Sequence, residues 1–348
     1  MKEKIRSAQI VVACADLDRA LEFYRDRLGF RLDAIFPADA PRTVVLSGGG
    51  LVLRLEKSDA STPLTLALDG GFDGESEREL FSPDGARVRL VDEQAAPALP
   101  EAVQKFAVST LGGGAWNAGR AGMLYRDLLP ERWGGRFIAS HIRIPAGGPV
   151  PDYVHYHKIR FQLIYCLAGQ ARLVYEDQGA PFWMRAGDCV LQPPEIRHRV
   201  LECSDGFEVL EIGCPAVHET LAEHRFDLPN GKAPDKFYGG QKFLHHVAEN
   251  AIWRSAENDG FVERDTGIRQ ATGGLADVRV LRAAAEAKFS VSHAGEFLFF
   301  FVTNGHLRLS TANGADHHLS TAAGFALPAG AEYSIEAAPQ TELIRVYL

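Results

Sequence analysis

The amino-acid sequence predicts a mainly β protein that holds more than one domain and begins with a small α+β domain. With 348 residues the chain exceeds the length of one typical domain. Alternating, β-rich runs punctuated by glycine and proline follow residue 120, as in Gln162–Gly169. The first hundred residues instead place a helical pattern between strand patterns. We therefore expect a small mixed domain first and β domains after it.

Composition and charge indicate an ordinary globular protein and disfavour two classes of partner. Hydrophobic residues make up 46% of the chain, enough for real cores, and charged residues make up 24%. The 37 Lys and Arg against 45 Asp and Glu give a net charge of −8. Because no run of basic residues stands out, neither nucleic acid nor a membrane surface is an expected partner.

Cysteine usage and the absence of long apolar runs predict a cytoplasmic location. The five cysteines are odd in number and contain no C-x2-C pair, which argues against a disulfide framework and against a structural zinc site. The start, MKEKIRSAQIVV, has no apolar signal region, and no uninterrupted apolar run is long enough to span a membrane. A reducing compartment is the expected environment.

The first 94 residues alternate between strand, helix and turn patterns. Asp16 or Asp18 can cap a helix that Gly29 ends, with a strand on each side. A hairpin is expected through Gly48–Gly50, and the turn Pro83–Gly85 precedes a further strand. These elements predict a small α+β domain.

The stretches DLDRALEFYRDRLGF and SPDGARVRL resemble the vicinal-oxygen-chelate (glyoxalase/bleomycin-resistance) family. The resemblance implies βαβββ modules, of which the second is badly abbreviated here. The family binds its metal through four residues on strands, and this chain matches one of them, Gln9. Arg54 and Arg89 stand where the family has Glu. The remaining position is held by Leu64 or Thr65. A single carboxamide cannot hold a divalent cation, so we expect a degenerate domain that serves packing, dimerisation or covering of a barrel mouth.

Three histidines and a glutamine form the candidate metal site. His155 and His157 are two residues apart, so both side chains leave an extended strand on the same face. Gln162 opens the next β-rich run, and His198 ends a later one. Three imidazoles and a carboxamide on facing strands can enclose one divalent metal, and imidazole suits Zn, Cu, Fe or Ni.

These residues resemble the two motifs of the cupin superfamily. The first motif is H-x-H, four residues, a Glu-type ligand, six residues and Gly, and it is met by His155, His157, Gln162 and Gly169. The second, G-x5-P-x-G-x2-H, is met by Gly187, Pro193 and His198, with Glu195 in place of the family's Gly. The resemblance implies a small β-barrel or jelly roll with one metal held inside it.

The departure from the motif is Gln162, which stands where the family has Glu. A neutral carboxamide leaves the metal with its full charge and favours an anionic partner at the open positions. Alternatively, Gln162 orients a metal-bound water and the metal has the three histidines alone. Fe(II) is the expected metal, with Zn, Ni, Mn and Cu as the other candidates.

The chain repeats itself at an offset of 135 to 139 residues, as a duplicated barrel requires. The matched pairs include Arg126 with Arg264, Gly134 with Gly273, Gly169 with Gly305, Gly187 with Gly324, and Pro193 with Pro328. The chain therefore resembles a bicupin. Of the motif's metal ligands, the second copy keeps only His293. Leu298 stands at the Glu position, and Tyr333 replaces the last His. Glu296 and His293 could together form a weak metal site with two ligands. A structural role for the second barrel is favoured instead, and the apolar run FLFFFV is expected to form part of its core.

The expected fold is thus two tandem cupin jelly-roll barrels preceded by a small glyoxalase-like domain. The expected boundaries are 1–94 for the glyoxalase-like domain, 95–120 for a linker, 121–228 for the metal-binding barrel, 229–245 for a second linker and 246–348 for the degenerate barrel.

Polar residues inside the β stretches are the candidates for substrate contact. Arg160 shares strand parity with Gln162 and could hold a carboxylate bidentately, although an outward, solvated position is the alternative. Arg143, Gln192 and Glu211 are further candidates, and Tyr153 could wall a pocket. We assign catalytic roles to Gln162 and Arg160. His218 and His224, which follow the barrel, are expected at the surface.

The resemblance to bicupins with one metal-bearing barrel implies a dioxygenase, as in gentisate and flavonol oxygenases. The substrate would be a small anionic aromatic or keto/enol acid that binds the open metal positions. Two alternatives stay open: a non-oxidative metal-dependent isomerase or lyase, and a small-molecule-binding or regulatory cupin without catalysis. A homodimer is expected because cupins often dimerise.

Overall fold

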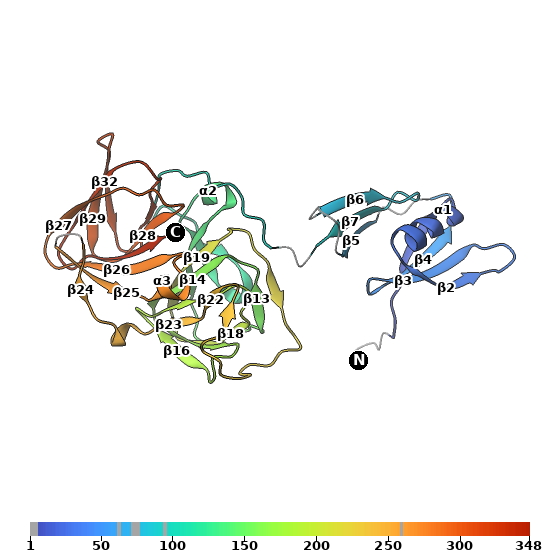
Figure 1. Cartoon of the computed structure of the whole chain (residues 1–348), viewed down its shortest axis with the longest axis horizontal. Helices are drawn as coiled ribbons and strands as arrows, with labels where there is room; N and C mark the ends of the chain where they lie inside the picture. Colours follow the sequence, from blue (N-terminus) through green and yellow to red (C-terminus); the bar gives the residue numbers. More distant parts are fainter. Residues whose placement is uncertain (1–5, 61–63, 71–76, 93–95, 258–259) are drawn as a thin grey trace. The chain divides into compact units, whose positions relative to one another are not determined.

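The computed structural model describes residues 6–60, 64–70, 77–92, 96–257 and 260–348, which form two compact units (Figure 1). The first unit is Met1–Ala96 and the second is Pro97–Leu348. Strands make up most of the regular structure, so the fold is mainly β, as predicted. Among the described residues, no helix is long and apolar enough to cross a membrane.

The first unit packs one helix on a four-stranded sheet of order β1-β4-β3-β2 and adds a three-stranded sheet of order β5-β7-β6. Asp16 caps the helix by accepting a hydrogen bond from the Arg19 N–H, and Gly48–Gly50 connect the predicted hairpin. The elements are β1 Ile10–Cys14, α1 Leu17–Glu22, η1 Phe23–Arg27, β2 Arg31–Phe36, β3 Thr43–Gly48, β4 Leu51–Lys57, β5 Thr65–Asp69, β6 Glu77–Phe81 and β7 Arg87–Val91.

The first barrel of the second unit has a large and a small sheet. The seven-stranded sheet has the order β23-β17-β14-β19-β11-β10-β9, and the six-stranded sheet has the order β16-β15-β18-β13-β20, with β12 on β18. The large sheet contains β9 Asn117–Ala118, β10 Leu124–Asp127, β11 Ile138–Ile144, β14 Phe161–Ala168, β17 Cys189–Leu191, β19 Phe207–Cys214 and β23 Leu244–His246. The small one contains β12 Gly148–Pro149, β13 His155–His157, β15 Gln170–Tyr175, β16 Phe182–Arg185, β18 His198–Cys203 and β20 Thr220–Ala222.

The second barrel repeats this arrangement with sheets of order β24-β25-β26-β33-β28-β31-β8 and β27-β32-β29-β30. Its strands are β8 Ala107–Ser109, β24 Arg254–Ser255, β25 Phe261–Asp265, β26 Asp277–Ala283, β27 Ala287–Val291, β28 Leu298–Asn304, β29 His306–Thr311, β30 Asp316–Ser320, β31 Gly324–Ala326, β32 Tyr333–Ala337 and β33 Glu342–Tyr347. The short elements of the unit are η2 Arg120–Gly122, α2 Arg132–Gly135, β21 Phe237–Tyr238, β22 Gln241–Lys242, η3 Ala248–Asn250 and α3 Ile268–Ala271.

The two large sheets share one apolar core. On β28, Phe299 and Phe301 join a core cluster that also contains Phe161 and Leu163 of β14, while Leu298 and Phe300 face the interior of the second barrel. Because both faces of β28 are buried, its sequence is continuously apolar rather than alternating. This confirms the run FLFFFV as core.

Both segments predicted as linkers contribute strands to the barrels. Strand β8, which precedes the first barrel, pairs with β31 of the second, and β23, which precedes the second barrel, pairs with β17 of the first. The linker prediction for 95–120 and 229–245 is therefore corrected in these places. Strands of three residues carry too little alternation to be recognised, but they cover sheet edges whose backbone groups would otherwise lack partners.

Two arginines at equivalent positions of the sequence repeat each form hydrogen bonds with the other barrel. Arg126 of β10 is fully buried, and its Nη2 donates a hydrogen bond of 2.6 Å to the Ala322 carbonyl of the second barrel. Arg264 of β25 donates from Nη2 to the Tyr165 hydroxyl (3.1 Å) and to the Gly187 carbonyl (3.3 Å) of the first barrel. Each arginine crosses the boundary between the barrels, as expected for a pseudo-twofold pair.

A tryptophan faces each of these guanidinium groups. Trp116 lies 5.8 Å from Arg126 and Trp253 lies 5.1 Å from Arg264, measured from the guanidinium carbon to the ring centroid. A cation over an aromatic face is attracted by the ring quadrupole, and the attraction grows when both groups are removed from water. The reciprocal arginines are thus held by aromatic rings as well as by carbonyl groups.

We predict that Arg126→Met lowers the free energy of unfolding of the Pro97–Leu348 unit by about 3 kcal/mol, because buried acceptors lose their charged donor. All four tryptophans of the chain lie in this unit, so tryptophan fluorescence during denaturant unfolding reports on it alone. The matched control is Arg172→Met, which removes a half-exposed ion pair with Glu202 and should cost less than about 1 kcal/mol. Equal losses in the two variants would contradict the prediction.

Candidate metal centre

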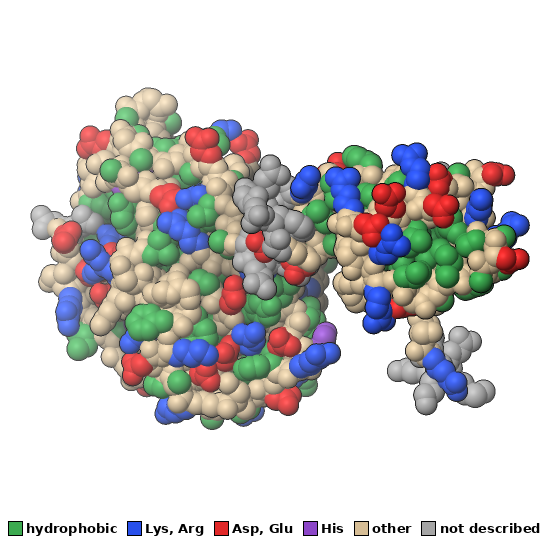
Figure 2. Space-filling model, turned by 45° about the vertical axis from the view of Figure 1, so that its right-hand side comes forward, with side chains coloured by type: hydrophobic (Ala, Val, Ile, Leu, Met, Phe, Trp, Pro, Cys, Tyr) green, Lys and Arg blue, Asp and Glu red, His purple; other side chains and the backbone are tan. Residues whose placement is uncertain are grey.

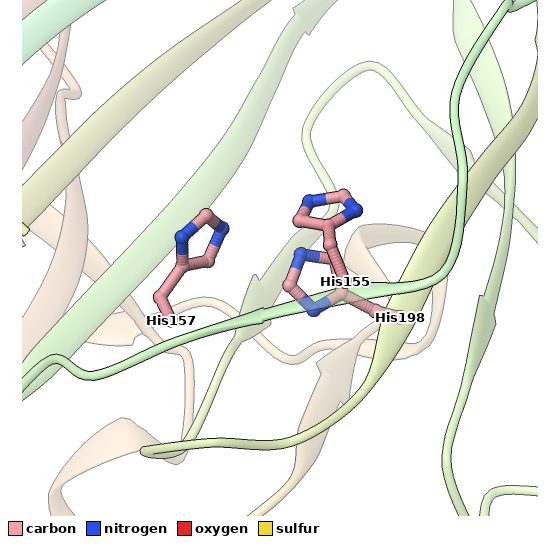
Figure 3. Close-up of side chains that lie close together, drawn as sticks. All are labelled: His155, His157 and His198. Carbon is pink, nitrogen blue, oxygen red and sulfur yellow. The ribbon is translucent and has the colours of Figure 1, made fainter. Parts of the chain in front are cut away.

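Two neighbouring strands of the small sheet bring the three predicted histidines together. His155 and His157 lie on β13, and His155 is in register with His198, the first residue of β18. One ring nitrogen from each residue lies within 4.8 Å of the others, and all three side chains are buried. Figure 3 shows the three rings close together, with His155 beside His198. Among the described residues, this is the single cluster of His, Cys, Asp or Glu with such spacing.

Backbone carbonyl groups set the tautomer of each ring. The Nδ1 atom of His155 lies 2.8 Å from the Tyr153 carbonyl, that of His157 lies 3.2 Å from the Glu219 carbonyl, and that of His198 lies 2.9 Å from the Ile196 carbonyl. Since a carbonyl only accepts, each Nδ1 must carry the hydrogen, and each Nε2 keeps its lone pair. This is the arrangement in which metal-binding histidines are commonly held.

Burial keeps the three rings neutral. Desolvation lowers the pKa of His157 to about 3 and lowers the pKa of His155, and neighbouring histidines and Arg120 add to this effect for His157. The pKa of His198 falls well below its ordinary value, again chiefly through burial and then through His155 and His157. Neutral imidazole is the form that binds a metal, so protonation does not compete at neutral pH.

The residues present fit a divalent metal. Three neutral imidazoles whose Nε2 atoms carry lone pairs are a donor set suited to Fe, Zn, Cu or Ni, and three protein ligands leave positions open for water or a bound molecule. The Nε2 of His155 accepts a hydrogen bond from Arg120 (2.8 Å), which a bound metal would have to replace. The three histidines are thus the residues that would hold such an ion, consistent with a metal-binding site inside the first barrel.

A cavity of about 280 Å³ adjoins the triad inside the first barrel. Its walls are mainly apolar, formed by Met123, Ile138, Ile142, Ile144, Ile164, Leu173, Met184, Val200, Phe207 and Val209. Polar groups enter it from several strands, namely Arg120, Tyr125, His155, His157, Gln162, Tyr175, Gln192, His198, Glu211, His218 and Thr220. An apolar chamber with a few convergent polar groups is the usual form of a small-molecule site.

Gln162 and Gln192 line this cavity and contact each other. The Nε2 of Gln192 donates to the Oε1 of Gln162 at 2.9 Å, and the Nε2 of Gln162 donates to the Oε1 of Glu211 at 2.7 Å. The hydroxyl of Tyr175 donates to the Oε1 of Gln192. Both glutamines thus lie where the sequence places them. Ligation of a metal by Gln162 and a catalytic or substrate-binding role for either residue stay predictions.

Arg160 lies outside the cavity, which corrects its predicted place in the site. Its Nη1 donates to Glu296 of the second barrel at 2.8 Å, and it is not among the residues that line the chamber. The parity argument fails because β14 begins at Phe161, so strand alternation does not extend back to Arg160. Glu296 also pairs with Arg136, so it binds arginines rather than forming a metal remnant with His293, whose Nε2 contacts the Leu327 carbonyl.

Arg143 and Tyr153 also lie outside the cavity lining. On β11 the side chains of Ile142 and Ile144 face the chamber, so Arg143 points to the other face, where it pairs with Glu208 at 2.8 Å. Tyr153 is 41% exposed and precedes β13, and it is its backbone carbonyl that holds the His155 ring. Both predictions of substrate contact are corrected by these positions.

Among the cavity residues that sequence reasoning missed, Arg120 and His218 lie beside the histidine triad. Arg120, inside the segment predicted as a linker, donates from Nη1 to Asp152 at 2.9 Å, and its Nη2 lies 2.8 Å from the Nε2 of His155. No local pattern marks it, because it precedes β13 by thirty-five residues. His218, expected at the surface, lines the cavity with its ring centroid 5.2 Å from that of His157. The cis Cys214–Pro215 bond that precedes it carries no recognisable sequence signal.

Two family models match the chain. The cupin domain matches residues 140–212, and the glyoxalase/bleomycin resistance protein/dioxygenase superfamily matches residues 6–66. No curated protein matches the chain.

Solved structures share the fold of the second unit. Salicylate 1,2-dioxygenase from Pseudaminobacter salicylatoxidans aligns with a TM-score of 0.53 at 16% identity, over 72% of this chain and 86% of that one. Oxalate decarboxylase from Lactobacillus farciminis aligns with a TM-score of 0.53 at 12% identity, over 73% of this chain and 89% of that one. The protein Ylba from E. coli aligns with a TM-score of 0.53 at 12% identity, over 73% and 94%. Together with the duplicated barrels, these matches show a cupin domain in the first barrel, a glyoxalase-like domain at the start of the chain, and the fold of a bicupin in the second unit.

Proposed function

We propose that this chain is a metal-dependent bicupin enzyme, a dioxygenase that acts on a small anionic aromatic or keto/enol acid. The observation that carries the proposal is the histidine triad, whose three Nδ1–carbonyl contacts leave three Nε2 lone pairs beside a mainly apolar chamber. The likeness to salicylate 1,2-dioxygenase, one structure of which holds gentisate, supports this choice of reaction and substrate class.

The proposed metal is one Fe(II) ion held by His155, His157 and His198, with Zn, Ni, Mn and Cu as the alternatives. When bound, such an ion supplies a positive centre that polarises an anionic substrate and binds dioxygen. The chain itself supplies a chamber with mainly apolar walls. Such walls lower the local dielectric constant, which strengthens charge interactions inside the chamber.

Arg120 is the proposed partner of the substrate's carboxylate. Among the residues that line the cavity it is the one with a guanidinium group, and its side chain is 35% exposed while it pairs with the buried Asp152. A guanidinium binds a carboxylate through two parallel hydrogen bonds. The volume of about 280 Å³ is at the small end for ligand pockets, which favours a single-ring or short-chain acid.

A non-oxidative lyase is the second candidate. Oxalate decarboxylase aligns as well as the dioxygenase does, with the same TM-score of 0.53. In that reading the metal acts only as a Lewis acid on a bound acid, and dioxygen is not consumed.

The proposal also includes a cytoplasmic location, a small-molecule partner and a homodimeric assembly. All five cysteines are buried and unpaired, which supports a reducing, cytoplasmic environment. Lys and Arg alternate with Asp and Glu over the face drawn in Figure 2, a pattern that supports a small-molecule rather than a nucleic-acid partner. The homodimer stays a prediction that rests on the cupin resemblance.

We predict that the protein binds one metal ion per chain and that His157→Ala loses it, because two imidazoles hold a divalent ion far more weakly than three. Metal content of the purified proteins, measured by elemental analysis after loading with Fe(II), tests this. The control is His306→Ala, which removes an exposed histidine of the second barrel and should keep the metal. A His157→Ala protein with a full complement of metal would refute the site.

Oxygen consumption separates the proposed reactions. With Fe(II)-loaded protein and a panel of aromatic and keto acids, we expect one dioxygen consumed per substrate lost, and no turnover without oxygen. Turnover under anaerobic conditions would instead select the lyase. Tight binding of an acid that is never consumed would overturn both and leave a binding protein.

A further inference from the structure

One carboxylate lines the cavity among the described residues, and it belongs to Glu211 on β19. On β19, Phe207, Val209 and Glu211 alternate toward the chamber, as strand geometry requires. Glu211 is in register with Ile164 of β14, two residues beyond Gln162. The cupin motif would place its acidic residue at position 162, so here the negative charge is carried by the neighbouring strand.

A directional chain of hydrogen bonds ends on this carboxylate. The Tyr175 hydroxyl donates to Gln192, the Gln192 amide donates to Gln162 at 2.9 Å, and the Gln162 amide donates to the Oε1 of Glu211 at 2.7 Å. Burial raises the pKa of Tyr175, so its hydroxyl keeps its hydrogen and starts the chain as a donor. Each amide thus has its oxygen toward Tyr175 and its nitrogen toward Glu211, whose Oε1 accepts the last hydrogen bond of the chain.

The amide at 162 and the acid at 211 require each other. A glutamate at position 162 would set two carboxylates at hydrogen-bond distance, and one of them would have to take up a proton. With the amide in place, each successive pair along the chain joins one donor to one acceptor, and Tyr175, Gln192 and Gln162 are buried. The second oxygen of Glu211, Oε2, has no hydrogen-bond partner among the described residues, and Glu211 lines the chamber.

The geometry points to Glu211 as the proton acceptor for an acidic hydroxyl of the bound ligand, with Gln162 as the residue that positions it. The ligand's O–H bond breaks, its electron pair stays on the ligand oxygen, and the proton forms a new O–H bond with Oε2 of Glu211. The proton returns to solvent when the product leaves. The inference rests on the proposed function for the class of ligand, a small acid with a phenolic or enolic hydroxyl.

The surroundings of Glu211 suit this task. The other charged or titratable groups that line the chamber are Arg120, Tyr125, His155, His157, Tyr175, His198 and His218. Glu211 contributes to raising the pKa of Tyr125, after burial, so that this phenol stays neutral. Glu211 is the one acidic side chain among the described residues that line the chamber, so its carboxylate is the group that can accept a proton from a ligand hydroxyl.

The test uses metal-loaded full-length protein and 5-nitrosalicylate, whose phenol and phenolate forms absorb at different wavelengths. Absorbance gives the phenolate formed on binding, and calorimetry in buffers of different ionisation enthalpy gives the protons released. For wild type we expect phenolate without proton release, because Glu211 keeps the proton. For Glu211→Gln we expect either less phenolate or one proton released per phenolate formed.

Metal content separates failure of this inference from failure of the proposed function. Glu211→Gln and the control Glu202→Gln should both keep one metal ion, since neither touches the triad. The inference is overturned if wild type releases one proton per phenolate formed, or if Glu211→Gln forms phenolate without releasing a proton. Either result leaves the proposed function standing. No binding of the probe by metal-loaded wild type overturns the ligand class and the inference with it. With a turned-over substrate, Glu211→Gln should lower kcat by about 100-fold or more while KM changes little.

The exchange of the two residues tests the role of Gln162. Gln162→Glu alone should lower the denaturant midpoint of the second unit, because two carboxylates then compete for one proton. The double variant Gln162→Glu, Glu211→Gln returns the acid to the motif position, lets the new carboxylate accept from both amides, and should restore the midpoint. A double variant no more stable than Gln162→Glu would contradict the coupling of the two positions.

Discussion

The back-to-back packing of the two large sheets is the constraint on which the second unit depends. Phe161 and Leu163 of β14 meet Phe299 and Phe301 of β28 in one apolar core. Each of these strands is thereby buried on both faces. Next to them lie β17 and β31, and the exchanged strands β23 and β8 pair with β17 and β31 and cover their outer edges. Reciprocal arginines then satisfy buried carbonyl groups at the same boundary.

This packing also determines what the first barrel presents to its interior. With the odd-numbered residues of β14 locked into the shared core, Gln162 and Ile164 must face inward, and the same holds for Glu211 on β19. The triad comes from the opposite, smaller sheet, on β13 and β18. One sheet of the barrel therefore supplies the metal ligands, while the other supplies the carboxylate and most of the hydrogen-bond chain that ends on it.

Duplication of one scaffold has led to two different interiors. In the first barrel the inward positions hold histidines and a glutamine around a chamber, whereas in the second Leu298 and Tyr333 occupy the corresponding places and belong to a dense apolar cluster. The side chains of that cluster fill the space between the sheets of the second barrel. This barrel contributes instead the surface against which the first barrel folds, which is a structural role consistent with its loss of metal ligands.

The sequence by itself determined the mainly β fold, the duplication and the grouping of His155, His157 and His198, because each depends on spacing within one or two strands or on a repeat along the chain. It placed Gln162 and Gln192 in the chamber for the same reason. Only the tertiary structure decided which polar residues join them. Arg120 and His218 reach the chamber from outside the motif strands. Arg143 and Arg160 leave it, since strand alternation turns one outward and stops short of the other. Such contacts depend on where strands begin and on which faces pack together, and both are set by burial across the whole unit.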